Sequence, residues 1–363
     1  MRADSKQSSS PGLSLWEKID LFPALLTVFT STLYASVTGL FRGKNGTRTY
    51  RFHLFRQLLQ TGLQRLSLRQ IQYLTPPTNK NYEDWSIREQ VQPVTISLNH
   101  GAFGHWVGKK NAKKVVVYYH GGGFALPSTA EHFGFCTEIL HSFNTTDDNI
   151  AFFFLTYTLT PKAVYPTQLA QAVDALRYIL TTRKPSNVLL GGDSAGGNLA
   201  LTVLMHITHP HPEIEPLTIS DDEEDRSLAG VYAIAPWVSF RTDWPSIKSN
   251  HYSDIISAAN LDRWSSGYLD ARNGESDPWS EPLSAPAEWW RDVKTKALLV
   301  TAGGDEILLS PIEALVDKVR SSGTEVEFVV GDRETHAPMM YGGGTDTQQG
   351  RAIERWLAGQ ISN

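Results

Sequence analysis

Six short apolar runs, separated by helical stretches, constrain the fold of this chain more than any other feature. The runs are rich in Val, Phe and Leu and lack polar alternation, which is typical of parallel strands buried on both faces. They cover residues 115–119, 151–157, 187–191, 230–235, 297–301 and 326–330. Helical patterns lie between them, notably over residues 168–180, 197–206 and 311–321. This alternation predicts an α/β domain over residues 91–363, with a mostly parallel, doubly wound sheet.

The segment before this domain has a different character. Residues 1–20 begin with a polar, Ser-rich stretch, and we expect them to be disordered. Residues 21–41 contain no charged side chain, and a stretch of this length is enough to span a bilayer. Several Ser and Thr residues and Pro23 dilute its hydrophobicity. A membrane anchor is the favoured interpretation of residues 21–41, because no cleavage site of the signal-peptide type follows.

The following segment, residues 42–90, is predicted to be a basic amphipathic cap or juxtamembrane segment. Its first part, from Arg42 to Arg69, contains seven Lys and Arg residues and no acidic one, with leucines at helical spacing. Such a helix beside an apolar segment is typical of an anionic membrane surface, and a soluble cap helix is the alternative. We therefore expect a membrane-associated protein, at the endoplasmic reticulum or lipid droplets, with a cytoplasmic location as the alternative. The basic run favours a cytosolic catalytic domain, whereas sequons at Asn45 and Asn144 permit a lumenal one.

Two polar insertions interrupt the α/β pattern. Residues 210–226 include an acidic run and predict a solvated loop. Residues 239–292 are compatible with helices, and their tryptophans predict a contribution to a pocket wall, with core packing as the alternative for any one of them. These tryptophans are Trp244, Trp264, Trp279, Trp289 and Trp290.

The most specific motif is a G-x-S-x-G sequence formed by Gly192, Asp193, Ser194, Ala195 and Gly196. It follows an apolar run and opens a helical stretch, which is the context of a nucleophile elbow. The two glycines let the chain turn tightly and leave room for a substrate. Ser194 is therefore the predicted nucleophile.

A second motif, His120 followed by Gly121, Gly122 and Gly123, comes directly after the first apolar run. Acyl transfer builds negative charge on a carbonyl oxygen, and preorganised backbone N–H groups stabilise that charge. We expect the N–H groups of Gly122, Gly123 and Ala195 to form this oxyanion hole. His120 is expected to brace the loop by hydrogen bonding and not to act as a catalyst.

An elbow serine needs a base and an orienting acid, which follow it in the chain order Ser, acid, His. His336 comes six residues after Val330, in the loop after the last predicted strand, and is the predicted base. The acid should follow the preceding strand, where Asp305 is the first choice. Glu306 and Asp332 are the alternatives.

The two glycine motifs together resemble the hormone-sensitive-lipase-like branch of the α/β-hydrolases. The link from Tyr157 to Pro161, followed by Tyr165 and Pro166, is similar to that family's segment between strand and helix. The resemblance runs from about residue 92 to residue 358. It implies the α/β-hydrolase fold, with helical cap elements beside the sheet and, in this chain, an N-terminal extension.

Within that branch, the layout resembles fungal membrane-anchored steryl acetate hydrolases. The apolar N-terminal segment, residues 277–283, Trp289 and Trp290 carry this weaker resemblance. Ala337 and Pro338 differ from the Gly-Phe pair that more often follows the histidine in the family, so the pocket beside the base is where this chain departs from its relatives.

These observations predict a serine hydrolase that cleaves carboxylic esters through an acyl-enzyme, with no cofactor and no metal. The leading substrate is a small apolar ester, in particular a steryl ester with a short acyl or aminoacyl group. A biosynthetic hydrolase or acyltransferase that acts on a thioester, lactone or amide is an alternative. A non-catalytic small-molecule receptor is a further alternative, against which the well-placed His336 argues. The net charge of −5 gives no indication of nucleic-acid binding, and the single cysteine, Cys136, excludes an intramolecular disulfide and a multi-cysteine zinc site.

Overall fold

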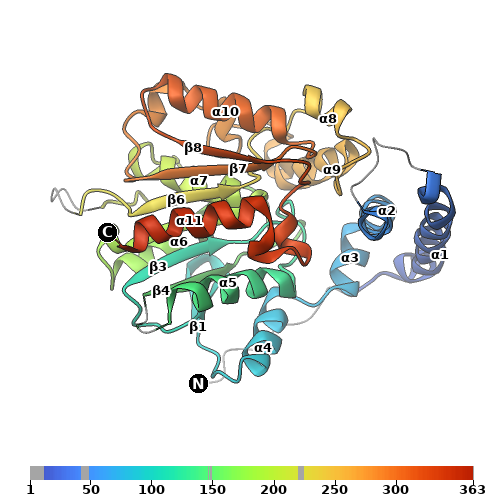
Figure 1. Ribbon diagram of the computed structural model, residues 1–363, viewed down its shortest axis with the longest axis horizontal. Coiled ribbons are helices and arrows are strands. Elements are labelled where there is room, and N and C mark those ends of the chain that lie inside the picture. The colour runs from blue at the N-terminus through green and yellow to red at the C-terminus, as the bar shows by residue number, and fades with distance from the viewer. Residues whose placement is uncertain (1–11, 42–48, 146, 148, 220–224, 363) are drawn as a thin grey trace.

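An eight-stranded sheet forms the centre of the computed structural model, in the order β1-β2-β4-β3-β5-β6-β7-β8. Strands β3 to β8 are parallel, β2 is antiparallel to β4, and β1 is antiparallel to β2. The strands are β1 (Thr95–Ser97), β2 (Phe103–Val107), β3 (Lys114–Tyr119), β4 (Ile150–Thr156), β5 (Val188–Asp193), β6 (Gly230–Ile234), β7 (Leu298–Gly303) and β8 (Glu327–Gly331). The structure describes residues 12–41, 49–145, 147, 149–219 and 225–362 (Figure 1).

All six predicted strands are present as β3 to β8, each within two residues of its expected bounds. The prediction of a mostly parallel, doubly wound α/β sheet is confirmed. Strands β1 and β2 were not predicted, because they are three and five residues long and β2 contains Gly104 and His105 within its apolar pattern. The predictions for residues 1–11, 42–48 and 220–224 lie outside the described residues.

Helices cover both faces of the sheet. Figure 1 shows α5 and α11 on the near face, and they share a buried cluster with alternate strand residues such as Val116. Val115 and Val117 point to the other face and pack in the cluster that contains α6, α7 and α10. The helices of the α/β body are α5 (Ala130–Phe143), α6 (Thr167–Leu180), α7 (Ala195–Thr208), α8 (Pro245–Ser249), α9 (Ala258–Tyr268), α10 (Leu309–Ser321) and α11 (Gln348–Ser362).

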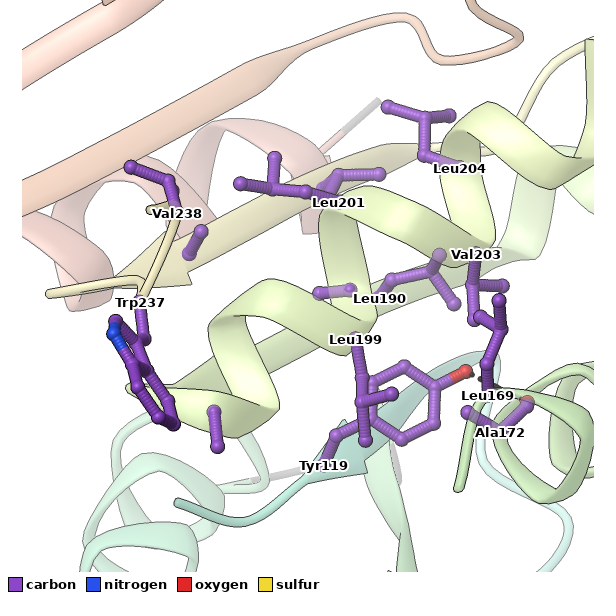
Figure 2. Packing of buried hydrophobic residues seen from close by; sticks show 14 of the residues in the cluster. Tyr119, Leu169, Ala172, Leu190, Leu199, Leu201, Val203, Leu204, Trp237 and Val238 are labelled. Atoms are coloured by element: carbon purple, nitrogen blue, oxygen red, sulfur yellow. Dashed lines mark hydrogen bonds between the residues drawn. The ribbon is translucent and has the colours of Figure 1, made fainter. Parts of the chain in front are cut away.

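Helix α7 is buried almost throughout, with twelve of its fourteen residues in the core. In Figure 2, its Leu199 and Val203 lie with Tyr119 of β3 and Leu169 of α6, all in one cluster. The Tyr119 hydroxyl also donates to the carbonyl oxygen of Ala172, at 3.0 Å. This packing holds the first turn of α7, and the serine before it, firmly against the sheet.

Among the described residues, four α-helices precede the α/β body, and the first begins earlier than predicted. Helix α1 begins at Leu15 because Ser14 and Glu17 form a capping box: the Ser14 side chain accepts from the Glu17 N–H, and the Glu17 carboxylate accepts from the Ser14 N–H. The predicted disorder of residues 1–20 is therefore wrong for residues 15–20. With the turn that follows it, the helix covers Leu15–Phe41 and is long and apolar enough, by length and composition, to cross a membrane. These helices are α1 (Leu15–Thr38), α2 (Tyr50–Arg65), α3 (Leu68–Leu74) and α4 (Thr78–Arg88).

Helices α2 and α3 form a cap that is hydrogen-bonded to the α/β body. The Gln72 amide donates to the carbonyl oxygens of Ala125 and Thr160, at 2.7 and 2.8 Å. The Asn260 amide of α9 donates to the carbonyl oxygen of Leu63, at 3.0 Å. The cap is therefore positioned over the loops that follow the parallel strands, where ligands bind in open α/β sheets.

Candidate active site

The elbow predicted around Ser194 is present between β5 and α7. Ser194 has φ 54° and ψ −118°, a conformation that a non-glycine residue rarely adopts. Its backbone N–H donates to the carbonyl oxygen of Ile234, at 2.8 Å. A side chain on Gly196 would collide with the carbonyl oxygen of Tyr119, so only glycine fits there. The strained turn places the serine at the carboxyl edge of the sheet.

The glycine loop after β3 approaches the same place. Gly122 and Gly123 have φ values of 104° and 60°, which favour glycine. Among the described residues, the N–H groups of Gly122, Gly123 and Ala195 have no hydrogen-bond acceptor. A side chain on Gly123 would also collide with the ring of Trp264. Three unpaired N–H groups beside a serine that lines the same cavity are the arrangement that an oxyanion requires.

Asp193 joins the elbow to the glycine loop. Its Oδ1 atom accepts from the Gly121 N–H at 3.0 Å and from the Tyr118 hydroxyl at 2.9 Å, and its Oδ2 atom lies 3.4 Å from Nε2 of His132. Burial raises the pKa of Asp193, but His132 and the Tyr118 hydrogen bond outweigh burial and hold that pKa below its ordinary value. The ionised carboxylate therefore holds the two loops together.

His120 lies inside the glycine loop and is fully buried. Its Nδ1 atom is 2.7 Å from the carbonyl oxygen of Gly121, and its ring stacks on Tyr157 with 4.3 Å between centroids. The Tyr157 hydroxyl donates to the carbonyl oxygen of His120, at 2.9 Å. Burial lowers the pKa of His120 to about 3, so the ring is neutral near pH 7. These contacts fit a bracing role.

His336 follows β8 and lies beside a buried carboxylate. Its Nδ1 atom is 3.5 Å from Oε1 of Glu306, which is fully buried. The other Glu306 oxygen accepts from the Gly303 N–H, at 2.6 Å. Burial lowers the pKa of His336, but the neighbouring Glu306 carboxylate, together with the charge of Asp254, raises that pKa above its ordinary value.

The structure does not bring Asp305, the predicted acid, to the imidazole. Its side chain is 29% exposed, and its carboxylate lies 3.9 Å from Nε of Arg333. Its backbone N–H donates to the carbonyl oxygen of Glu334, which fixes the loop with this side chain directed away from His336. The longer side chain of Glu306 reaches the ring instead. Asp332, the other alternative, has no contact with His336 among the described residues.

A second buried carboxylate, which the sequence analysis missed, belongs to Asp254 in the 239–292 insertion. Its Oδ1 atom accepts from the backbone N–H groups of His336 and Ile255, at 3.2 and 2.7 Å. Its Oδ2 atom accepts from the N–H of Ile307, at 2.7 Å. Burial, aided by Glu306, raises its pKa to about 6, although His336 opposes that shift. Asp254 thus connects the loop that carries His336 to the loop that carries Glu306, and nothing in its local sequence indicates this contact.

Ser194, His336 and the glycine loop line one cavity of about 400 Å³, within the range of small-molecule sites. Its polar side is formed by Ser194, His336, Gly122, Gly123, Thr129, Glu131, His132 and Asp193. The remaining wall is mostly apolar, and three of its residues occupy one face of α2. This wall contains Phe55, Leu59, Leu63, Leu126, Ile255, Ile256, Trp264, Met340 and Tyr341.

Of the five tryptophans expected at the pocket, only Trp264 lines this cavity. Trp290 is fully buried in the core. Trp279 and Trp289 pack on each other at 5.0 Å, and Trp289 stacks on His209. The expectation of a tryptophan-rich wall is therefore wrong, and α2 supplies the apolar surface instead.

The described residues contain no group of three or more His, Cys, Asp and Glu side chains arranged to hold a metal ion.

Comparisons with known proteins agree with this geometry. The profile of the alpha/beta hydrolase fold family matches residues 116–340. Steryl acetyl hydrolase 1 of Saccharomyces cerevisiae is 24% identical over 252 residues, which cover 67% of this chain and 56% of the yeast protein. An esterase of Acinetobacter venetianus is 23% identical over 242 residues, or 66% of this chain and 71% of the esterase.

Among solved structures, an esterase from the bacterial hormone-sensitive lipase family superposes with a TM-score of 0.62 at 22% identity, covering 97% of this chain and all of that chain. The α/β-hydrolase fold and the resemblance to hormone-sensitive-lipase-like hydrolases are confirmed.

Proposed function

Because the chain belongs to the alpha/beta hydrolase fold family, we propose that it is a serine hydrolase of carboxylic esters. One observation carries the proposal: the elbow Ser194, the base His336 and the unpaired N–H groups of the glycine loop converge on a single cavity. A buried histidine beside a carboxylate is arranged to accept the serine proton.

The reaction proceeds in two acyl-transfer steps. His336 takes the proton of the Ser194 hydroxyl as its oxygen attacks the ester carbonyl. The N–H groups of Gly122, Gly123 and Ala195 bind the oxyanion that develops. His336 then gives its proton to the leaving alcohol as the ester C–O bond breaks. Water, activated by the same histidine, hydrolyses the acyl-serine and returns the enzyme to its starting state.

Glu306 takes the role that the sequence assigned to Asp305. A carboxylate at Nδ1 keeps the proton on that nitrogen, directs Nε2 toward the serine and stabilises the imidazolium. The distance of 3.5 Å and the full burial of Glu306 support this assignment. In apo structures such contacts are often long and shorten only when substrate is bound.

The proposed substrate carries a short acyl group on a bulky apolar alcohol, with a sterol as the leading case. The apolar wall of the cavity suits such an alcohol, and an apolar helix adjoins the cap that forms this wall. The similarity to a steryl acetyl hydrolase supports the same substrate class.

A p-nitrophenyl ester chain-length series, assayed beside steryl acetate in detergent, tests this proposal with the wild type and Ser194→Ala. We expect kcat/KM for steryl acetate to be at least comparable to that for p-nitrophenyl acetate. If the enzyme hydrolyses short p-nitrophenyl esters but leaves steryl acetate untouched, the sterol is excluded and the general esterase remains.

We also propose that the N-terminal region attaches the enzyme to a membrane, at the endoplasmic reticulum or lipid droplets, with the catalytic domain in the cytosol. A cytosolic catalytic domain is supported by the sequon at Asn144. The side-chain amide that a lumenal glycan would modify is half-buried and donates to the carbonyl oxygen of Ile150. Asn45 lies outside the described residues. Deletion of residues 1–45 should move the protein to the high-speed supernatant. A full-length protein that is already wholly soluble would contradict the attachment.

A further inference from the structure

We infer that α1 lies flat on the membrane and inserts one face into a single leaflet, without crossing the bilayer. This inference rests on the membrane attachment proposed above and specifies its geometry. It concerns the surface formed by the outward side of α1, from Leu15 to Phe41, which we call the α1 outer face.

The burial pattern of α1 is the reverse of that in a soluble amphipathic helix. Its buried residues are the small Ala24, Val28 and Ala35. Its large apolar residues point away from the protein, where a soluble helix would carry polar side chains. They include Leu15, Trp16, Ile19, Phe22, Leu25, Leu26, Phe29, Leu33, Tyr34, Val37, Leu40 and Phe41, with Trp16, Phe22, Tyr34 and Phe41 each more than 70% exposed. A face of this kind is matched to hydrocarbon and not to water.

The inner side of α1 is bound along α2 by polar contacts. The Arg65 guanidinium donates to the Asp20 carboxylate at 2.6 and 2.9 Å. Near the middle, the Gln57 amide donates to the Ser31 hydroxyl at 2.9 Å. Near the other end, the Tyr50 hydroxyl donates to the carbonyl oxygen of Ser36 at 2.6 Å. The order of these contacts makes the two helices an antiparallel pair, which Figure 1 shows at one end of the molecule with α2 next to the body.

This pairing is incompatible with a spanning α1. A helix that crosses the bilayer while bound along α2 would carry Arg65, Gln57 and the other polar residues of α2 into hydrocarbon, at a high cost in free energy. Helix α2 is itself fixed to the body, because the Arg263 guanidinium donates to the carbonyl oxygens of Leu63 and Leu66. An α1 that lies in the plane of the surface keeps every one of these contacts and buries only its outer face in lipid.

The same arrangement brings the cavity close to the lipid. Along α2, Phe55 and Leu59 line the cavity, whereas Gln57 and Arg65 contact α1. Helix α2 alone, about 10–12 Å across with its side chains, therefore separates the cavity from α1. The leaflet that holds α1 is then the compartment from which an apolar ester reaches Ser194.

A topology experiment tests the inference directly. Gly12→Cys, before α1, and Ser321→Cys, at the end of α10, introduce two exposed reporter thiols, while the native Cys136 is buried. Sealed microsomes from cells that express the full chain are treated with a membrane-impermeant maleimide. An in-plane α1 predicts that both thiols label, or that both are protected until detergent is added. Labelling of one thiol and protection of the other would show a spanning helix and overturn the inference.

A second experiment tests the outer face itself, with phosphatidylcholine–phosphatidylserine vesicles. The triple variant Phe22→Asp, Phe29→Asp and Leu33→Asp should bind vesicles roughly 100-fold more weakly than the wild type, because three apolar side chains lose their burial in lipid. The matched control replaces three exposed apolar residues outside α1 and should bind like the wild type: Ile87→Asp, Val91→Asp and Val330→Asp.

Hydrolysis of water-soluble p-nitrophenyl acetate is measured in parallel. Hydrolysis should be unchanged in both triple variants, because neither set of substitutions touches the cavity. This assay tests the proposed esterase activity, whereas vesicle binding tests the position of α1, so the failure of one is distinguished from the failure of the other. Equal vesicle binding by wild type and the α1 variant would overturn the inference. A stable dimer in water that covers α1 and does not bind vesicles would overturn it as well.

Discussion

The nucleophile side and the base side of the cavity are constructed in different ways. On the nucleophile side, the glycine loop and the elbow are two contiguous segments whose function depends on backbone geometry, such as the φ of 54° at Ser194. On the base side, residues from separate loops meet: the Glu306 carboxylate lies beside the His336 imidazole, and the Asp254 carboxylate accepts from the His336 backbone N–H. The backbone turns of the nucleophile side require glycine at fixed positions, which can be recognised in the sequence. The contacts between distant loops on the base side produce no local sequence pattern.

The largest effects should come from Ser194 on the nucleophile side and His336 on the base side, because proton transfer between them requires both. Ser194→Ala and His336→Ala should each reduce kcat/KM for p-nitrophenyl butyrate by roughly 10³ to 10⁶-fold, because members of such a group act as a unit. Both variants should unfold near the wild-type temperature, and the Ser194→Ala variant should not react with a fluorophosphonate probe. Substantial activity in a folded Ser194→Ala variant would place the nucleophile elsewhere.

The next prediction distinguishes the two adjacent acids of the base side. Glu306→Gln should lower kcat by roughly 10² to 10⁴-fold, because the imidazole loses the carboxylate that selects its tautomer. Asp305→Asn is the matched control and should change kcat only a few-fold, since its carboxylate faces Arg333 and water. The reverse ranking would restore Asp305 as the acid.

A prediction for the nucleophile side concerns the glycine loop. Gly123→Ala should lower kcat by roughly 10² to 10³-fold, about 3 kcal/mol, while KM changes little, because the N–H group meets the oxygen only as charge develops. The positive φ and the contact with Trp264 leave no room for the added methyl group. Gly134→Ala, on α5 with open space around it, is the control and should retain wild-type kcat. An unchanged kcat for Gly123→Ala would remove this loop from the mechanism.

The smallest effect is expected at Asp254, which positions the base without meeting the substrate. His336 is active only when neutral, so kcat/KM should fall as pH drops through its pKa. The negative charge of Asp254 raises that pKa, so Asp254→Asn should move the acid limb of the profile to lower pH and reduce the plateau by roughly 10-fold. Asp292→Asn, an exposed control, should leave the profile in place. An acid limb that stays where it is in Asp254→Asn would reduce this residue to a structural support.

Much of the architecture could be predicted from local sequence. Runs such as residues 115–119 and 230–235 indicate parallel strands by themselves, because a strand buried on both faces needs apolar residues throughout. The two glycine motifs and the position of His336 after the last strand depend on backbone turns and chain order, which one segment can specify. Strands β1 and β2 escaped prediction because their short, mixed sequences become strands only by pairing, β2 with β4 and β1 with β2.

The tertiary structure alone decided which side chains meet. Asp305 and Glu306 are adjacent in sequence, and only the packing of their loop against Glu334 and Gly303 turns the second one toward the imidazole. The sequence shows that α1 is apolar, but whether its large residues point into the protein depends on α2, which binds the other side of α1 through contacts such as Arg65 with Asp20 and Gln57 with Ser31. The physical reason is the same in both cases: backbone conformation is set by neighbours along the chain, whereas the direction of a side chain is set by whatever packs against it.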